Sequence, residues 1–112
     1  MRNTALKSVL LAGALALFTL PIASAKSYDI TLAGPTMIGN TELKAGAYSL
    51  KVKGSTAIFT NEESGKSVSE TARIETVGRK YDLTAVETAK KGDTNFLRAI
   101  ELGGSKTKLE FQ

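Results

Sequence analysis

The sequence predicts an all-β protein: one small antiparallel meander that closes into a barrel or folds into a two-sheet sandwich. Glycines recur every 5 to 14 residues beyond residue 33, and the stretches between them are rich in Thr, Val, Ile and aromatic residues. Several stretches alternate apolar and polar residues, which is typical of strands with one face in water. The connections are too short for a crossover helix, so sequential strands are expected to pair with each other. This pattern favours the barrel over the sandwich.

Eight strands are expected, and alternation predicts which face of each is buried. In the third strand, Tyr48, Leu50 and Val52 share one face, while in the last strand Leu109 and Phe111 do. The expected strands lie near 27–33, 36–38, 47–53, 56–60, 67–77, 80–89, 95–102 and 106–111.

The strand over 95–102 is expected to place Phe96, Ile100 and Leu102 on the core face. Arg98 falls on the same face, where its aliphatic stem would lie along apolar neighbours and its charged head would reach water.

The strand before it is expected to place Tyr81, Leu83 and Ala85 on one face. Two segments, 67–77 and 84–91, also contain helix formers, so a short helix remains an alternative in either. The period of two in the first segment, and the Thr and Ser content of both, favour strands.

Glycine-containing turns are expected at 53–55, 76–79, 90–93 and 102–106, because glycine reaches positive φ at no steric cost. A polar loop is expected at 61–65.

The first 25 residues have the layout of a secretory signal peptide. Arg2 and Lys7 give a positive start, and an apolar run over 8–20 follows, too short for the roughly 20 residues of a membrane-spanning helix. Small residues then precede an expected cleavage between Ala25 and Lys26. The predicted product is one β domain over 26–112, periplasmic or secreted, with no stable membrane insertion.

Cleavage would leave 87 of the 112 residues, with 13 basic and 11 acidic side chains, a net charge of +2. The basic residues are scattered in small pairs, whereas a nucleic-acid-binding protein concentrates them on one face. Nucleic acid is therefore not an expected partner. The chain contains no cysteine, which excludes disulfides and thiolate metal sites.

No catalytic, cofactor-binding or metal-binding residue is predicted. The sequence contains no histidine, which removes histidine-based triads and histidine metal sites. A hydrolase working through two carboxylates would survive this exclusion, and it stays as one alternative. The six aromatic side chains of the expected domain are interpreted as core; read as a pocket lining, they give a second alternative, a carrier of an apolar small molecule. The six are Tyr28, Tyr48, Phe59, Tyr81, Phe96 and Phe111.

The segment over 43–52 reads L-K-A-G-A-Y-S-L-K-V and resembles the L-x-A-G-x-Y-x-L-x-V pattern of exported β-sandwich domains. Together with the segment over 100–111, it makes the chain similar to small uncharacterised secreted proteins common in Acidobacteria. The resemblance implies a β fold and an envelope or extracellular location, and it carries no activity.

The expected function is a non-enzymatic binding or structural module of the bacterial cell envelope. Its expected partner is an envelope or extracellular protein, or a small apolar ligand. A partner-binding module is expected to expose an apolar patch or an unprotected strand edge. The strand over 106–111 is the first candidate for such an edge.

Overall fold

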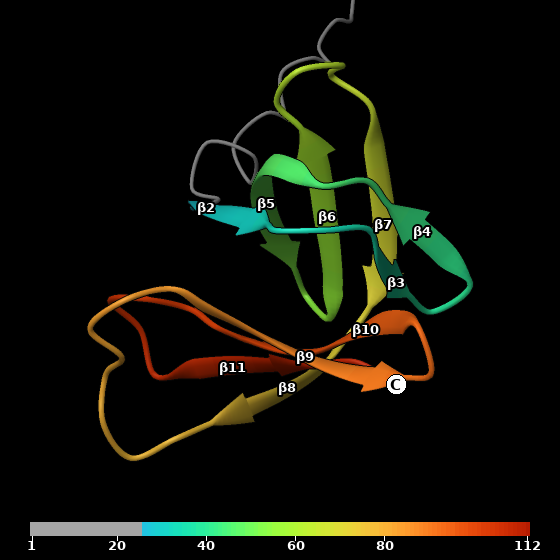
Figure 1. Cartoon of the computed structure of the whole chain (residues 1–112). Helices are drawn as coiled ribbons and strands as arrows, with labels where there is room; N and C mark the ends of the chain where they lie inside the picture. Colours follow the sequence, from blue (N-terminus) through green and yellow to red (C-terminus); the bar gives the residue numbers. More distant parts are fainter. Residues whose placement is uncertain (1–25) are drawn as a thin grey trace, which may run out of the picture.

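The computed structural model describes residues 26–112, and every regular element in this part of the chain is a strand (Figure 1). The all-β prediction is confirmed. The strands form two sheets in a sandwich-like arrangement and no closed barrel, so the preference for a barrel is wrong. In chain order the strands are β2 (Ser27–Leu32), β3 (Thr36–Ile38), β4 (Thr41–Leu43), β5 (Gly46–Lys53), β6 (Thr56–Asn61), β7 (Ser67–Thr71), β8 (Arg73–Thr76), β9 (Ala85–Lys91), β10 (Thr94–Glu101) and β11 (Thr107–Glu110).

The four-stranded sheet has the order β2-β5-β6-β7, with every neighbouring pair antiparallel. Its last three strands form the expected meander. Lys53 pairs with Thr56 across a two-residue turn, and Gly54 enters that turn at φ 60°. Only a residue without Cβ takes this conformation freely, so the glycine fixes the register of the hairpin.

The six-stranded sheet has the order β4-β3-β10-β11-β8, and β9 pairs with β10. β3 pairs with β10 in parallel, with Met37 beside Phe96. These residues lie far apart in the sequence, so the prediction that sequential strands pair throughout is wrong for this sheet. Figure 1 shows β8 to β11, coloured gold to red, below the four-stranded sheet.

The single strand expected over 67–77 is two strands that belong to different sheets. β7 ends at Thr71 and pairs with β6, whereas β8 begins at Arg73 and pairs with β11. Ala72 lies between them with 3% of its surface exposed, and its N–H donates to the carbonyl of Ser55 at 2.8 Å. The chain therefore crosses from one sheet to the other at a small, buried residue. No helix forms here or in the segment 84–91.

The strand expected over 80–89 begins later, at Ala85, because the preceding loop folds over the β10–β11 hairpin. The N–H of Tyr81 donates to Ser105, and the N–H of Gly104 donates to the carbonyl of Tyr81. Leu83, expected on the core face, is 78% exposed. The backbone of this loop therefore hydrogen-bonds to the turn of the β10–β11 hairpin instead of continuing β9 toward residue 80.

A β-bulge overturns the face expected for β10. Leu97 pairs with Thr88 and Ala99 with Glu87, so Arg98 is an extra residue between them. The extra residue reverses the alternation beyond it. Leu97 therefore joins Ile100 in the core.

Phe96, expected on the core face with Ile100, instead lies on the opposite face and is half-buried. The expectation for Leu102 is confirmed, since it is 3% exposed and belongs to the core. Arg98 is exposed, on the bulge.

The core lies between the two sheets and takes fully buried side chains from both. Leu50 and Phe59 come from the four-stranded sheet, and Ile100 and Leu109 come from the six-stranded sheet. The ring centroids of Phe59 and Phe111 lie 6.0 Å apart with the planes tilted by 52°, within the range of favourable aromatic pairs. The two sheets thus share one core.

The aromatic residues divide between core and surface. Tyr48 and Phe111, the strongest core candidates of the sequence, are buried, as is Phe59. The hydroxyl of Tyr48 donates to the carbonyl of Lys44 at 2.8 Å, which satisfies its one polar group. Tyr28 packs against the core from its edge.

The last strand, β11, is not a free edge. It pairs with β10 on one side, through Ile100 and Leu109, and with β8 on the other, through Ile74 and Leu109. The first candidate for an unprotected edge is therefore fully paired within the chain.

The predicted signal peptide and Ala25 of its cleavage site lie outside the described residues, and Lys26 is the first residue described. Within 26–112, no helix has the length and apolar character needed to cross a membrane.

Candidate functional site

An open groove with a volume of about 950 Å³ runs over the outer face of the six-stranded sheet. Strands β8 to β11 supply most of its lining. The rest of the lining includes Gly39, the last two residues of β7 (Glu70 and Thr71) and Ala72, which follows them. We call this feature the outer groove.

β11 and β8 place charged side chains on the outer face of the sheet, because successive side chains of a strand point to opposite faces. Leu109 points into the core, so Lys108 and Glu110 point outward. Arg73 of β8 pairs in register with Glu110, and Glu75 pairs with Lys108. Opposite charges therefore face each other across the two strands, the arrangement that stabilises a strand pair.

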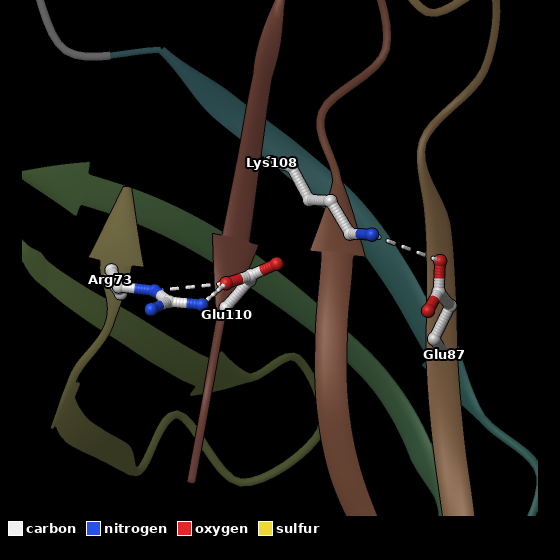
Figure 2. Close-up of polar contacts among 4 residues, drawn as sticks. All are labelled: Arg73, Glu87, Lys108 and Glu110. Atoms are coloured by element: carbon white, nitrogen blue, oxygen red, sulfur yellow. Dashed lines mark hydrogen bonds and ion pairs between the residues drawn. The ribbon is translucent and has the colours of Figure 1, made fainter. Parts of the chain in front are cut away.

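Two ion pairs cross the groove face, as Figure 2 shows. The guanidinium of Arg73 donates to Oε1 of Glu110 through both Nε and Nη2. The Nζ of Lys108 lies 3.8 Å from Oε2 of Glu87, which comes from β9. Three strands, β8, β11 and β9, are thus linked across the face by charged side chains.

The Arg73 contact sets the protonation of Glu110. The hydrogen bond from Arg73, together with its positive charge, lowers the pKa of Glu110, because both favour the ionised carboxylate. The same bond raises the pKa of Arg73. Glu110 is consequently held as an acceptor, the opposite of what a general acid at neutral pH requires.

The floor of the groove is apolar where β10 passes beneath it. Ala99 is 4% exposed and yet is not part of the core between the sheets. Phe96 and Ala89 pair in register beside it, and Phe111 lines the same groove.

Two cations of the groove lie outside the two ion pairs, and so does the carboxylate of Glu70, which also lines the groove. The Nζ of Lys91 lies 5.7 Å from the centroid of the Phe96 ring, a cation–π distance. Arg98 lies on the bulge, two residues beyond Phe96, and also lines the groove. Among residues 26–112, neither side chain forms an ion pair.

Tyr81 lies in the loop between β8 and β9, against the turn of the β10–β11 hairpin. Burial, and then the negative charge of Glu101, raise the pKa of its phenol. Its hydroxyl is therefore neutral at physiological pH.

Within 26–112 no cluster of three His, Cys, Asp or Glu side chains is placed to hold a metal ion. In this part of the chain, the groove combines an apolar floor, two ion pairs, two unpaired cations and the unpaired carboxylate of Glu70.

Sequence reasoning assigned no binding residue, so every groove residue was missed. The alternation of the last strand did place Lys108 and Glu110 outward. Nothing in the sequence indicated that Arg73 and Glu87 would lie beside them, because those neighbours depend on pairing between distant strands. Comparisons with protein families, curated proteins and solved structures give no match for this chain.

Proposed function

We propose that this chain is an exported, non-enzymatic binding module of the cell envelope, and that the outer groove is its binding surface. The observation that carries the proposal is the pair of cations, Lys91 and Arg98, on either side of Phe96 along the sheet. A carboxylate next to an apolar group fits this place, because both its charge and its apolar surface find partners there.

The proposed partner is an acidic, partly apolar segment of another exported protein. The groove is open and spans four strands, so it offers an extended surface rather than a closed compartment for a small molecule. The aromatic side chains Tyr48, Phe59 and Phe111 fill the core instead of lining an internal cavity, which argues against the carrier alternative.

The hydrolase alternative draws no support from the groove. Inverting and retaining glycosidases both need a carboxylic acid with a raised pKa, whereas Arg73 lowers the pKa of Glu110, the best-defined carboxylate of the groove.

The test is a titration of the ¹⁵N-labelled chain with a peptide of alternating glutamate and leucine, followed by amide chemical shifts. We expect shifts confined to the groove-lining residues of β9, β10 and β11. A control peptide of alternating lysine and leucine should give none of these shifts, because Lys91 and Arg98, the cations on either side of Phe96, repel its ammonium groups.

A matched pair of variants locates the interaction. Replacing both Lys91 and Arg98 by Glu should weaken peptide binding about tenfold or more, which corresponds to about 1.4 kcal/mol. The control replaces Lys51 and Lys53 by Glu, the same charge change on exposed positions of β5 outside the groove. Equal weakening by both variants, or preference for the lysine peptide or an acidic oligosaccharide, would contradict the proposal.

A further inference from the structure

β9 is the longest strand whose second edge is unpaired in the described part of the chain. It spans seven residues and pairs only with β10. Five of its seven side chains are exposed, and the other two are half-buried. An open edge of this length offers a row of free N–H and C=O groups to another strand.

The charges on β9 are self-complementary. Glu87 and Lys91 lie on the groove face of the strand, two residues on either side of Ala89. If a second β9 lies antiparallel with Ala89 opposite Ala89, each Glu87 meets Lys91 of the other copy. Two opposite-charge pairs then flank a central pair of small side chains, and such pairs stabilise adjacent strands.

Charge also disfavours the neighbouring registers. Centring the pair on Glu87 places the two carboxylates opposite each other, and centring it on Lys90 places two ammonium groups opposite each other. Centring it on Thr88 forms no ion pair, because Glu87 then faces Ala89. Of these registers, only the one centred on Ala89 therefore forms two opposite-charge pairs without placing like charges opposite each other.

The backbone is compatible with this register. Lys91 and Thr94 flank a two-residue turn, Gly92-Asp93, so their N–H and C=O groups face each other. The alternation of an antiparallel strand then directs the N–H and C=O groups of Thr88 and Lys90 away from β10. In the register centred on Ala89, Thr88 of one copy lies opposite Lys90 of the other, so these free groups meet.

The other open edges lack this combination. β4 and β8 span only three and four residues. β2 and β7 each contain a single charged residue, Asp29 and Glu70, so self-pairing of either strand forms no opposite-charge pair.

We propose that β9 pairs edge to edge with β9 of a second copy of this chain, joining the two six-stranded sheets into one. Lys91 also belongs to the proposed ligand site of the groove, so the dimer is tested without that ligand. A seven-residue strand pair is small compared with a standard interface, so we expect reversible, concentration-dependent association.

Disulfide trapping tests the register directly, because the chain contains no cysteine of its own. In the proposed register the two Ala89 residues form a non-hydrogen-bonded pair, whose Cα atoms lie about 4.5 Å apart, within disulfide range. Under mild oxidation, Ala89→Cys should therefore form a covalent dimer.

Thr88→Cys is the matched control, because its two copies lie on a diagonal at about 7–8 Å and should not cross-link. Cross-linking of Thr88→Cys but not Ala89→Cys would overturn the register. Absence of cross-linking in both variants would overturn the pairing itself.

A charge exchange tests the attraction. In sedimentation velocity across a concentration series, Lys91→Glu should raise the dimer Kd about tenfold or more, because two attractive pairs become repulsive. Adding Glu87→Lys to Lys91→Glu restores both pairs and should return the Kd to within about threefold of the original.

Lys51→Glu, on the central strand β5, should leave the dimer Kd unchanged, and circular dichroism should confirm that each variant is folded. A purified chain that remains monomeric from micromolar to millimolar concentration would overturn the proposal, as would a double variant no better than Lys91→Glu.

Discussion

The four-stranded and six-stranded sheets differ in how far apart in the sequence their paired strands lie. β5, β6 and β7 follow one another through short turns. In the six-stranded sheet, β3 pairs with β10 and β8 pairs with β11, so strands from opposite ends of the domain meet. The first sheet is built largely by turn chemistry, and the second by contacts that form only when the chain has collapsed around a shared core.

The largest expected effect tests whether this shared core makes the two sheets one cooperative unit. Phe59→Ala in the four-stranded sheet and Leu109→Ala in the six-stranded sheet each empty a fully buried position. We expect losses of about 3–5 and about 2–5 kcal/mol in the free energy of unfolding.

Chemical denaturation followed by circular dichroism and by tyrosine fluorescence measures this effect, and both probes should report one transition. Leu83→Ala, at a position 78% exposed, is the control and should change stability by less than about 0.5 kcal/mol. Separate transitions for the two probes would show that the sheets unfold independently.

The next effect compares a glycine required by a long-range contact with one required by a local turn. A Cβ at Gly103 would lie 2.6 Å from the backbone nitrogen of Thr84, so Gly103→Ala should cost about 1–3 kcal/mol. A Cβ at Gly54 would meet nothing within 4 Å, but its φ of 60° should make Gly54→Ala cost about 1–2 kcal/mol.

Thermal melts measure both costs, with Gly78→Ala as the control, because that position has free space and no positive φ. Amide exchange should separate the two mechanisms. Gly103→Ala should expose the amides of the 77–84 loop, whereas Gly54→Ala should affect only the β5–β6 hairpin. Unchanged stability of Gly103→Ala would show that the loop does not pack on the hairpin as described.

A smaller effect concerns the hydrogen bond between the 77–84 loop and the β10–β11 hairpin. The N–H of Gly103 donates to Oγ1 of Thr84 at 2.9 Å. Thr84→Val removes the acceptor while keeping the shape, and we expect a loss of about 0.5–1.5 kcal/mol. Thr84→Ser keeps the acceptor and should lose less; equal losses in the two variants would assign the effect to packing instead.

The smallest effect is the pH dependence of the Arg73–Glu110 pair on the surface of the six-stranded sheet. Because folding lowers the pKa of Glu110, this group stabilises the folded chain above the ordinary glutamate range of about 4.3. That stabilisation is lost as pH falls through the lower pKa of the folded state.

Glu110→Gln should therefore lower Tm slightly above about pH 4.3 and leave it nearly unchanged at pH values that protonate the carboxyl of the folded chain. Between these limits the Tm of the variant should depend less on pH than that of the original chain. Glu63→Gln, in an exposed loop, is the control. The effect should be small because the side chain of Arg73 is 80% exposed and solvent screens the pair. An identical pH profile for the original chain and Glu110→Gln would contradict the prediction.

The amino-acid sequence by itself determined the all-β class, most strand positions and the hairpin turns, because alternation and glycine chemistry act over a few neighbouring residues. It also placed Tyr48, Leu50, Leu109 and Phe111 in the core, as the structure has them. The three-residue strand β4 was missed, although Gly39, at φ 60°, marks the turn before it.

Only the tertiary structure decided where strands change partners. The crossing at Ala72, the bulge at Arg98 and the loop folded over Gly103 each depend on a residue distant in sequence, which local patterns do not encode. The outer groove follows from these features, since the bulge turns Phe96 outward and the crossing brings Arg73 to Glu110. Local residue chemistry sets the elements of this protein, and long-range packing sets the surface that they form together.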